Sequence, residues 1–144
     1  MYTTLLWATD GSDGAETALQ EGLGLLAPGG KLFAFHCDQR FVGSHVGGIP
    51  VLADEDERRA HIRRRVEELV ADGVNAELVV ETTHHSTAHA IVEAAEAAKV
   101  DAIVCGTRGL GGLQGALLGS VSKELLHHAH VPVIVVPPKA AVPA

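Results

Sequence analysis

Five short apolar segments, each of strand length, alternate along the chain with segments of helical periodicity. The predicted strands are residues 4–9, 31–37, 76–81, 101–106 and 131–136. Parallel strands need a crossover connection, usually a helix, so this alternation predicts an α/β fold. We expect a single doubly wound, open, parallel five-stranded sheet in the order 3-2-1-4-5, with helices on both faces.

Between the strands, apolar residues recur at the spacing of one helical face, which predicts helices that pack on the sheet. Asp13 and Glu16 are placed as a capping pair at the start of the first helix. The apolar stripes are Ala15, Ala18, Leu19, Gly22, Leu23 and Leu26 in the first helix, Ile62, Val66, Leu69 and Val70 in a second over residues 54–71, and Ala88, Ile91, Val92 and Ala95 in a third.

The length of 144 residues fits one domain, and no internal repeat divides it, so residues 1–144 are predicted to form a single unit. The chain is 47% hydrophobic and 20% charged, which is typical of a soluble globular protein. No apolar run approaches the roughly 20 residues of a membrane span. The first residues lack the pattern of a signal peptide, so we expect a cytoplasmic protein.

A formal net charge of −7 argues against nucleic acid and anionic membranes as partners, because both are negatively charged. An anionic ligand must therefore be held by local groups. The two cysteines, Cys37 and Cys105, have neither CxxC spacing nor a disulfide-rich setting. We expect both to be reduced and buried.

A glycine-rich segment follows the fourth predicted strand and leads into a helix. It begins with Gly106-Thr107-Arg108-Gly109 and ends at Gly119-Ser120. A strand that leads through glycines to a helix N-terminus presents backbone N–H groups and the positive end of the helix dipole to an anion. The spacing alone equally fits a surface loop with Ser120 as an ordinary N-cap residue.

The predicted topology brings this segment close to an acidic residue from the other end of the chain. In open α/β sheets, ligands bind beyond the carboxyl ends of the strands, where the order of the strands reverses. The first strand leads to Asp10 and the fourth ends at Gly106. A carboxylate there accepts hydrogen bonds from ribose hydroxyls while the helix end holds phosphates, so the combination predicts a nucleotide site.

Three motifs make the chain resemble the universal stress protein family over nearly its whole length. The first is Ala8-Thr9-Asp10-Gly11-Ser12 after the first strand, and the second is the G-x2-G-x9-G-(S/T) pattern of Gly106, Gly109, Gly119 and Ser120. The third is the apolar ending from His128 to Val136. The glycine pattern is that of the family's ATP-binding branch. One departure is the segment 82–87, Thr-Thr-His-His-Ser-Thr, where the family often has a Gly-x-Pro turn.

The resemblance implies ATP, ADP or AMP as the ligand, with Mg²⁺ or Mn²⁺ between the phosphates. It implies that Asp10 contacts the nucleoside, that Cys37 offers backbone groups to adenine, and that Gly106 borders the ribose. The residues that it places around the phosphates are Gly109, Gly119, Ser120, Val121 and Ser122. Arg108 is the only Lys or Arg between Gly106 and Ser120, and it either approaches a phosphate or stays solvated.

Nine histidines raise a rival hypothesis, transition-metal binding. They include two clusters, each of which lacks a third ligand of assured geometry, and a surface or helix-capping role explains both as well. The clusters are His84, His85 and His89, and His127, His128 and His130.

Catalysis is a separate question from binding. The chain lacks the lysine of a GxxxxGK[ST] phosphate loop, and no motif places a base for water. We therefore expect a binding or sensing module with little or slow hydrolysis; slow ATPase or phosphotransferase activity is the alternative.

The sequence also makes predictions about a long connection and about the last strand. The connection over residues 38–53 is long and contains Gly43, Gly47, Gly48 and Pro50, which is consistent with a mobile lid or with a disordered insertion. The strand from Val131 to Val136 is uncharged, β-branched and predicted to lie at the edge of the sheet. Its unpaired backbone groups favour pairing with a second copy, and the resemblance also implies a homodimer through this strand.

Overall fold

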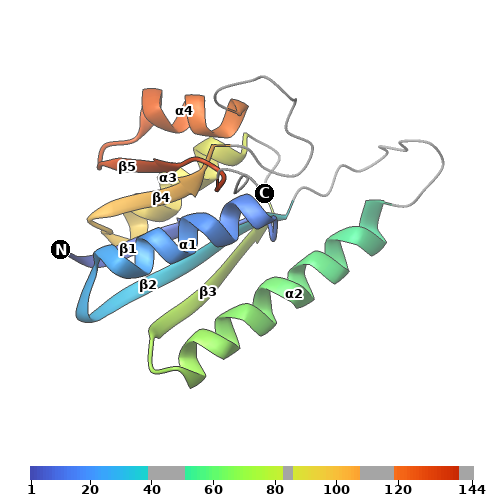
Figure 1. The fold of residues 1–144 in the computed structure, drawn as a ribbon. Coiled ribbons are helices and arrows are strands. Elements are labelled where there is room, and N and C mark those ends of the chain that lie inside the picture. Colours follow the sequence, from blue (N-terminus) through green and yellow to red (C-terminus); the bar gives the residue numbers. More distant parts are fainter. Residues whose placement is uncertain (39–50, 83–85, 108–118, 140–144) are drawn as a thin grey trace, which may run out of the picture.

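The computed structural model describes residues 1–38, 51–82, 86–107 and 119–139, with the side chains of residues 51–54 excepted (Figure 1). Strands and helices alternate along these residues, as the sequence predicts. The elements are β1 (Tyr2–Ala8), α1 (Asp13–Leu25), β2 (Leu26–Asp38), α2 (Val51–Ala71), β3 (Asn75–Thr82), α3 (Thr87–Ala98), β4 (Ala102–Gly106), α4 (Ser120–His128) and β5 (Val133–Val136).

The five strands form one parallel sheet in the order β3-β2-β1-β4-β5, which confirms the predicted topology. β1 lies at the centre, between β2 and β4 (Figure 1). Its register pairs Trp7 with Ala34 of β2 and with Val104 of β4. The carboxyl ends of these three strands therefore meet at one edge of the sheet.

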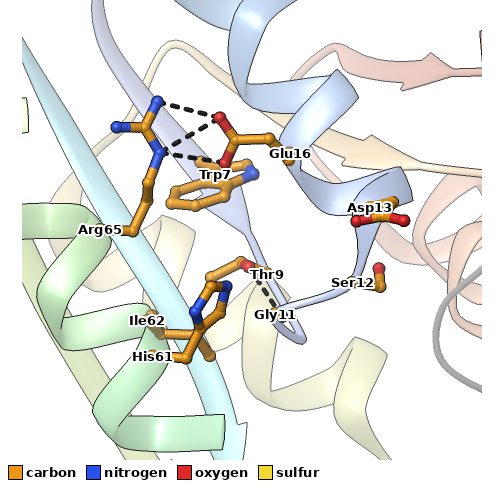
Figure 2. A pocket seen from close by; sticks show the side chains of 9 residues that line it. All are labelled: Trp7, Thr9, Gly11, Ser12, Asp13, Glu16, His61, Ile62 and Arg65. Atoms are coloured by element: carbon orange, nitrogen blue, oxygen red, sulfur yellow. Dashed lines mark hydrogen bonds and ion pairs between the residues drawn. The ribbon is translucent and has the colours of Figure 1, made fainter.

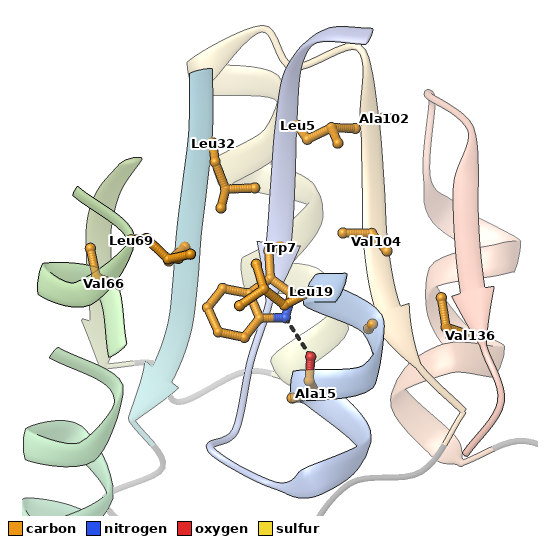
Figure 3. Close-up of a cluster of buried hydrophobic side chains, with 12 residues drawn as sticks. Leu5, Trp7, Ala15, Leu19, Leu32, Val66, Leu69, Ala102, Val104 and Val136 are labelled. Carbon is orange, nitrogen blue, oxygen red and sulfur yellow. Dashed lines mark hydrogen bonds between the residues drawn. The ribbon is translucent and has the colours of Figure 1, made fainter. Parts of the chain in front are cut away.

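Side chains that alternate along the strands build two cores, one on each face of the sheet. On one face, α1 and α2 cover a cluster centred on Trp7, whose indole Nε1 donates a hydrogen bond to the carbonyl of Ala15 at 2.8 Å (Figure 3). On the other face, α3 and α4 cover a cluster that contains Leu6, Phe35 and Leu125. Helices on both faces are thus confirmed.

α1 packs closely on the sheet at Gly22. A Cβ atom at this position would lie 3.1 Å from Cγ1 of Val104, closer than most real contacts of a Cβ atom. The predicted apolar stripe of α1 is buried at Ala15, Ala18, Leu19 and Gly22. The absence of a side chain at Gly22 therefore lets the helix approach β4.

Five features differ from the sequence prediction. Ser12, not Asp13, is the N-cap of α1, and its Oγ accepts from the amide of Ala15 at 3.2 Å. β5 begins at Val133 rather than at residue 131. β2 begins at residue 26 and α2 at residue 51, both earlier than predicted. Val70 of α2 is 53% exposed, so it lies off the buried stripe of Ile62, Val66 and Leu69.

The described residues contain no helix that is both long enough and apolar enough to span a bilayer. The predicted lid segment is described only at its two ends, the last residue of β2 and the first turn of α2. Residues 39–50 between them lie outside the described residues, and so do residues 83–85 of the departing segment before α3.

Candidate functional site

The turn after β1 is held by hydrogen bonds from its own side chains. Oδ1 of Asp10 accepts from the amide of Ser12 at 3.0 Å, and Oγ1 of Thr9 accepts from the amide of Gly11 at 3.1 Å. Gly11 has a φ of +81°, which favours glycine. These bonds place the Asp10 side chain between the end of β1 and the start of α1, at the edge predicted to bind the nucleoside.

Hydrogen bonds join the two ends of the glycine-rich segment to each other and to the sheet. The amide of Gly119 donates to the carbonyl of Thr107 at 2.6 Å, and the amide of Thr107 donates to the carbonyl of Val136 at 3.1 Å. Ser122 Oγ donates to the carbonyl of Gly106 at 2.9 Å, and the Ser122 residue is only 3% exposed. The end of β4 and the start of α4 are therefore fixed against each other. Arg108 and Gly109 lie outside the described residues.

The first backbone amides of α4 have no acceptor within the helix. Gly119, not Ser120, is the N-cap, and it makes no side-chain capping bond. Lys123 donates to the carbonyl of Gly119 at 3.1 Å as in the first turn of a helix. The amides of Ser120, Val121 and Ser122 come before it and have no acceptor within the helix. Ser120 is exposed, whereas the hydroxyl of Ser122 is directed at backbone carbonyls.

Both cysteines are buried free thiols, as predicted. Burial raises the pKa of Cys37, although a hydrogen bond with Thr87 opposes the increase. Burial also raises the pKa of Cys105, to about 11, and a side-chain interaction with Ser122 opposes the increase. Neither thiol is therefore a ready nucleophile, since only the thiolate reacts. Cys37 lies at the end of β2, next to the β1 turn, where its backbone was predicted to meet adenine.

A buried polar cluster beside this edge was not predicted from the sequence. It consists of His36 and Asp38 of β2 and Glu55 of α2, which pair with Thr9, Arg59 and Arg58. One signal was present, because Glu55 lies seven and fourteen residues before Ile62 and Leu69 on the buried stripe of α2. Alternation along β2 likewise places His36 and Asp38 on the face that buries Leu32 and Ala34.

A separate cavity of about 240 Å³ lies between α1, α2 and the end of β1. Figure 2 shows Arg65 reaching across from α2 to Glu16, with distances of 2.9 to 3.1 Å, beside the ring of Trp7. Burial alone would raise the pKa of Glu16, but hydrogen bonds from Arg65 and Gln20 lower it. The charges are thus paired within the protein. This cavity shares Gly11 and Ser12 with the β1 turn and lies on the α1 and α2 face.

Two histidines of the predicted metal-binding clusters lie beside glutamate side chains. Nε2 of His89 pairs with Glu93 at 2.9 Å, and Nδ1 of His130 lies 3.5 Å from Glu96. Within the described part of the chain, no three His, Cys, Asp or Glu side chains gather to hold a metal ion. His84 and His85 lie outside it, so the rival metal hypothesis for that cluster stays a prediction.

Comparison with known proteins identifies relatives over most of the chain. The model of the Universal stress protein family matches residues 1–137. A universal stress protein of Thermus aquaticus is 32% identical over 146 residues, covering 94% of this chain and 99% of that protein. Universal stress protein MJ0531 of Methanocaldococcus jannaschii is 31% identical over 141 residues, covering 94% and 82%. A longer Mycolicibacterium smegmatis relative, 38% identical over 90 residues, is matched over only 30% of its length.

Solved structures share the fold. The hypothetical protein MJ0577 superposes with a TM-score of 0.79 at 24% identity, covering 98% of this chain and 99% of that one. A universal stress protein in complex with cAMP has a TM-score of 0.61 at 24% identity, covering 96% and 99%. An Arabidopsis thaliana protein of the same family, with AMP bound, has a TM-score of 0.67 at 18% identity, covering 96% and 93%.

Proposed function

This chain belongs to the universal stress protein family, and on that premise we propose that it binds an adenine nucleotide, ATP, ADP or AMP, at the carboxyl edge of β1 and β4. Two structural neighbours carry cAMP and AMP, which supports this class of ligand. We infer a stress-response or sensing module in which binding, rather than rapid chemistry, is the activity.

The observation that carries the proposal is the hydrogen bond that joins the two ends of the glycine-rich segment. The bond from Gly119 to Thr107 turns the N-terminus of α4 toward the end of β4, next to the β1 turn. Three backbone amides at that terminus and the helix dipole favour phosphate oxygens. The net charge of the chain is −7, so such local donors are what an anionic ligand needs.

The proposed contacts follow from these positions. Asp10 would accept from the ribose and the backbone of Cys37 would meet adenine, while Gly106 would border the ribose. Ser120 would use its exposed hydroxyl, and Val121 and Ser122 their amides, since the Ser122 hydroxyl is already committed. Gly109, Gly119 and Arg108 complete the proposed phosphate contacts.

Mg²⁺ or Mn²⁺ would be held mainly by phosphate oxygens. Both ions prefer oxygen ligands, and Mg²⁺ usually binds through one or two protein groups plus the phosphates of a substrate. The described residues gather no set of three His, Cys, Asp or Glu side chains for a metal. The exposed hydroxyl of Ser120 lies in the same turn as the phosphate-binding amides and is a candidate protein ligand for the ion.

We also propose little or slow hydrolysis, a cytoplasmic location and a homodimer through β5. Phosphoryl transfer needs a positioned nucleophile, and no base for water is assigned by any motif in the sequence. β5 lies at an edge of the sheet, which leaves one side of its backbone without a strand neighbour among the described residues.

Two assays test the proposal. Protein purified under native conditions is extracted, and the extract is analysed by mass spectrometry; an adenine nucleotide in near-equal amount to the protein is expected. Turnover of ATP with Mg²⁺ or Mn²⁺ is then measured for the native protein and for Asp10→Ala. Rates far below about 10 per second are expected. Rapid hydrolysis that Asp10→Ala abolishes would establish an enzyme instead.

A further inference from the structure

His36 is buried between two hydrogen-bond acceptors. The residue is 2% exposed, and its Nδ1 lies 3.0 Å from the carbonyl oxygen of Thr9. Its Nε2 lies 3.4 Å from Oε2 of Glu55, which is itself paired with Arg58 on α2. The buried imidazole of His36 therefore links the residue after β1 to α2.

The bond to Thr9 requires a proton on Nδ1 of His36, whether or not Nε2 also carries one toward Glu55. A carbonyl oxygen only accepts hydrogen bonds, so Nδ1 of His36 must donate. The amide of the same Thr9 donates to the carbonyl of Phe35 at 2.9 Å. β2 therefore binds both backbone groups of Thr9. The backbone carbonyl of Phe35 accepts from the Thr9 amide, and the His36 side chain donates to the Thr9 carbonyl.

Thr9 directly precedes Asp10, so this bond acts on the proposed nucleoside contact. The hydroxyl of Thr9 accepts from Gly11, and the carboxylate of Asp10 accepts from Ser12. The peptide whose oxygen His36 holds is the Thr9–Asp10 peptide itself. Rotation of that peptide would turn the Asp10 side chain away from its place above β1.

We propose that His36 is a positioning residue for nucleotide binding, an inference that rests on the proposed function. Its Nδ1–H holds the Thr9 carbonyl and so preorganises the Asp10 carboxylate, while Glu55 holds the opposite side of the ring. Preorganised groups bind more tightly because less freedom is lost on binding. One lost hydrogen bond of about 1 to 1.4 kcal/mol corresponds to a five- to tenfold weaker affinity.

A matched pair of amide substitutions separates this role from packing. In His36→Asn the amide nitrogen lies near the position of Nδ1, whereas in His36→Gln it lies near Nε2. Both variants keep a polar amide in the same buried place. We expect His36→Asn to bind Mg-ATP within about twofold of the native protein, and His36→Gln to bind about tenfold more weakly.

Calorimetry with Mg-ATP on nucleotide-free protein gives the affinities, and thermal unfolding gives the stability of each variant. Native protein that fails to bind ATP contradicts the proposed function itself. Native protein that binds, with equal affinities in the two folded variants, overturns the role of His36. If either variant fails to fold, nitrogen-15 NMR of the native histidine ring decides: a protonated Nδ1 supports the role, and an unprotonated Nδ1 overturns it.

Discussion

Ser122 donates its hydroxyl proton to the carbonyl oxygen of Gly106 at 2.9 Å, across 16 residues of sequence. The bond joins the first turn of α4 to the last residue of β4. Together with the bond from Gly119 to Thr107, it fixes both ends of the glycine-rich segment. The proposed phosphate-binding amides therefore have a defined place relative to the sheet.

Ser122→Ala should destabilise the protein, because it leaves the partly buried carbonyl of Gly106 without this donor. The expected loss in the free energy of unfolding is about 1–2 kcal/mol, measured by urea denaturation. Ser120→Ala is the matched control, since Ser120 is exposed in the same turn. Equal stability losses in the two variants would contradict the assigned role of the Ser122 hydroxyl.

Two glycines of α1 should respond oppositely to alanine. Gly24→Ala should raise the free energy of unfolding by up to about 1 kcal/mol, because nothing lies within 4 Å of an added Cβ and alanine favours the helix. Gly22→Ala should lower it, because its Cβ would lie 3.1 Å from Val104. Thermal unfolding of the two variants measures both effects. A gain in stability for Gly22→Ala would show that α1 does not need this close approach.

The thiols should resist alkylation in the folded protein. Burial raises the pKa of Cys37, and raises that of Cys105 to about 11, so few thiolates exist at pH 8. Iodoacetamide labelling followed by mass spectrometry should be slow without denaturant and fast in urea. Rapid labelling of Cys105 in the native protein would contradict its burial.

The raised pKa of Cys105 predicts how the stability of the protein depends on pH in the alkaline range. Between pH 9 and about 11 the folded state keeps the Cys105 proton that the unfolded state releases. Stability should therefore fall as pH rises through this range. In Cys105→Ala this fall should be smaller, as measured by urea denaturation at each pH. A fall of the same size in the variant would assign the effect to other groups.

Apolar periodicity reports burial directly, so the sequence predicts the alternating strands and helices. The rules for doubly wound parallel sheets then predict the strand order and the meeting of β1 with β4. The sequence does not predict the contact between His36 and Glu55, since a charged helix with acids and bases at close spacing is typical of a solvated face. Two signals indicated burial: the position of Glu55, one heptad before Ile62, and the alternation along β2 that places His36 on the same face as Ala34. The late start of β5 has a local cause. Pro132 has no N–H to donate, although its carbonyl still accepts from Ile103 at 2.9 Å.

Homodimer formation through β5 should depend on its outer backbone groups. The carbonyls of Pro132 and Val136 accept from Ile103 and Thr107, so alternation directs the groups of Val133 and Val135 outward. Val135→Pro removes an outward donor and should convert a dimer to a monomer. Light scattering at tens of micromolar measures this.

Val135→Thr keeps the outward amide and serves as the control, so it should stay dimeric. A native protein that is monomeric at the same concentration would contradict pairing through β5. A folded Val135→Pro that stays dimeric would place the interface elsewhere.

The most direct test of adenine-nucleotide binding is calorimetry with Mg-ATP on folded, nucleotide-free protein. The native protein and Gly24→Ala should each bind one nucleotide per chain. Gly119→Val should bind none, because a branched side chain would fill the space in which phosphate approaches the amides at the start of α4. Circular dichroism confirms that each sample is folded. Saturable binding that Gly119→Val abolishes is the predicted result; no heat of binding from folded native protein at millimolar ATP would contradict the proposal.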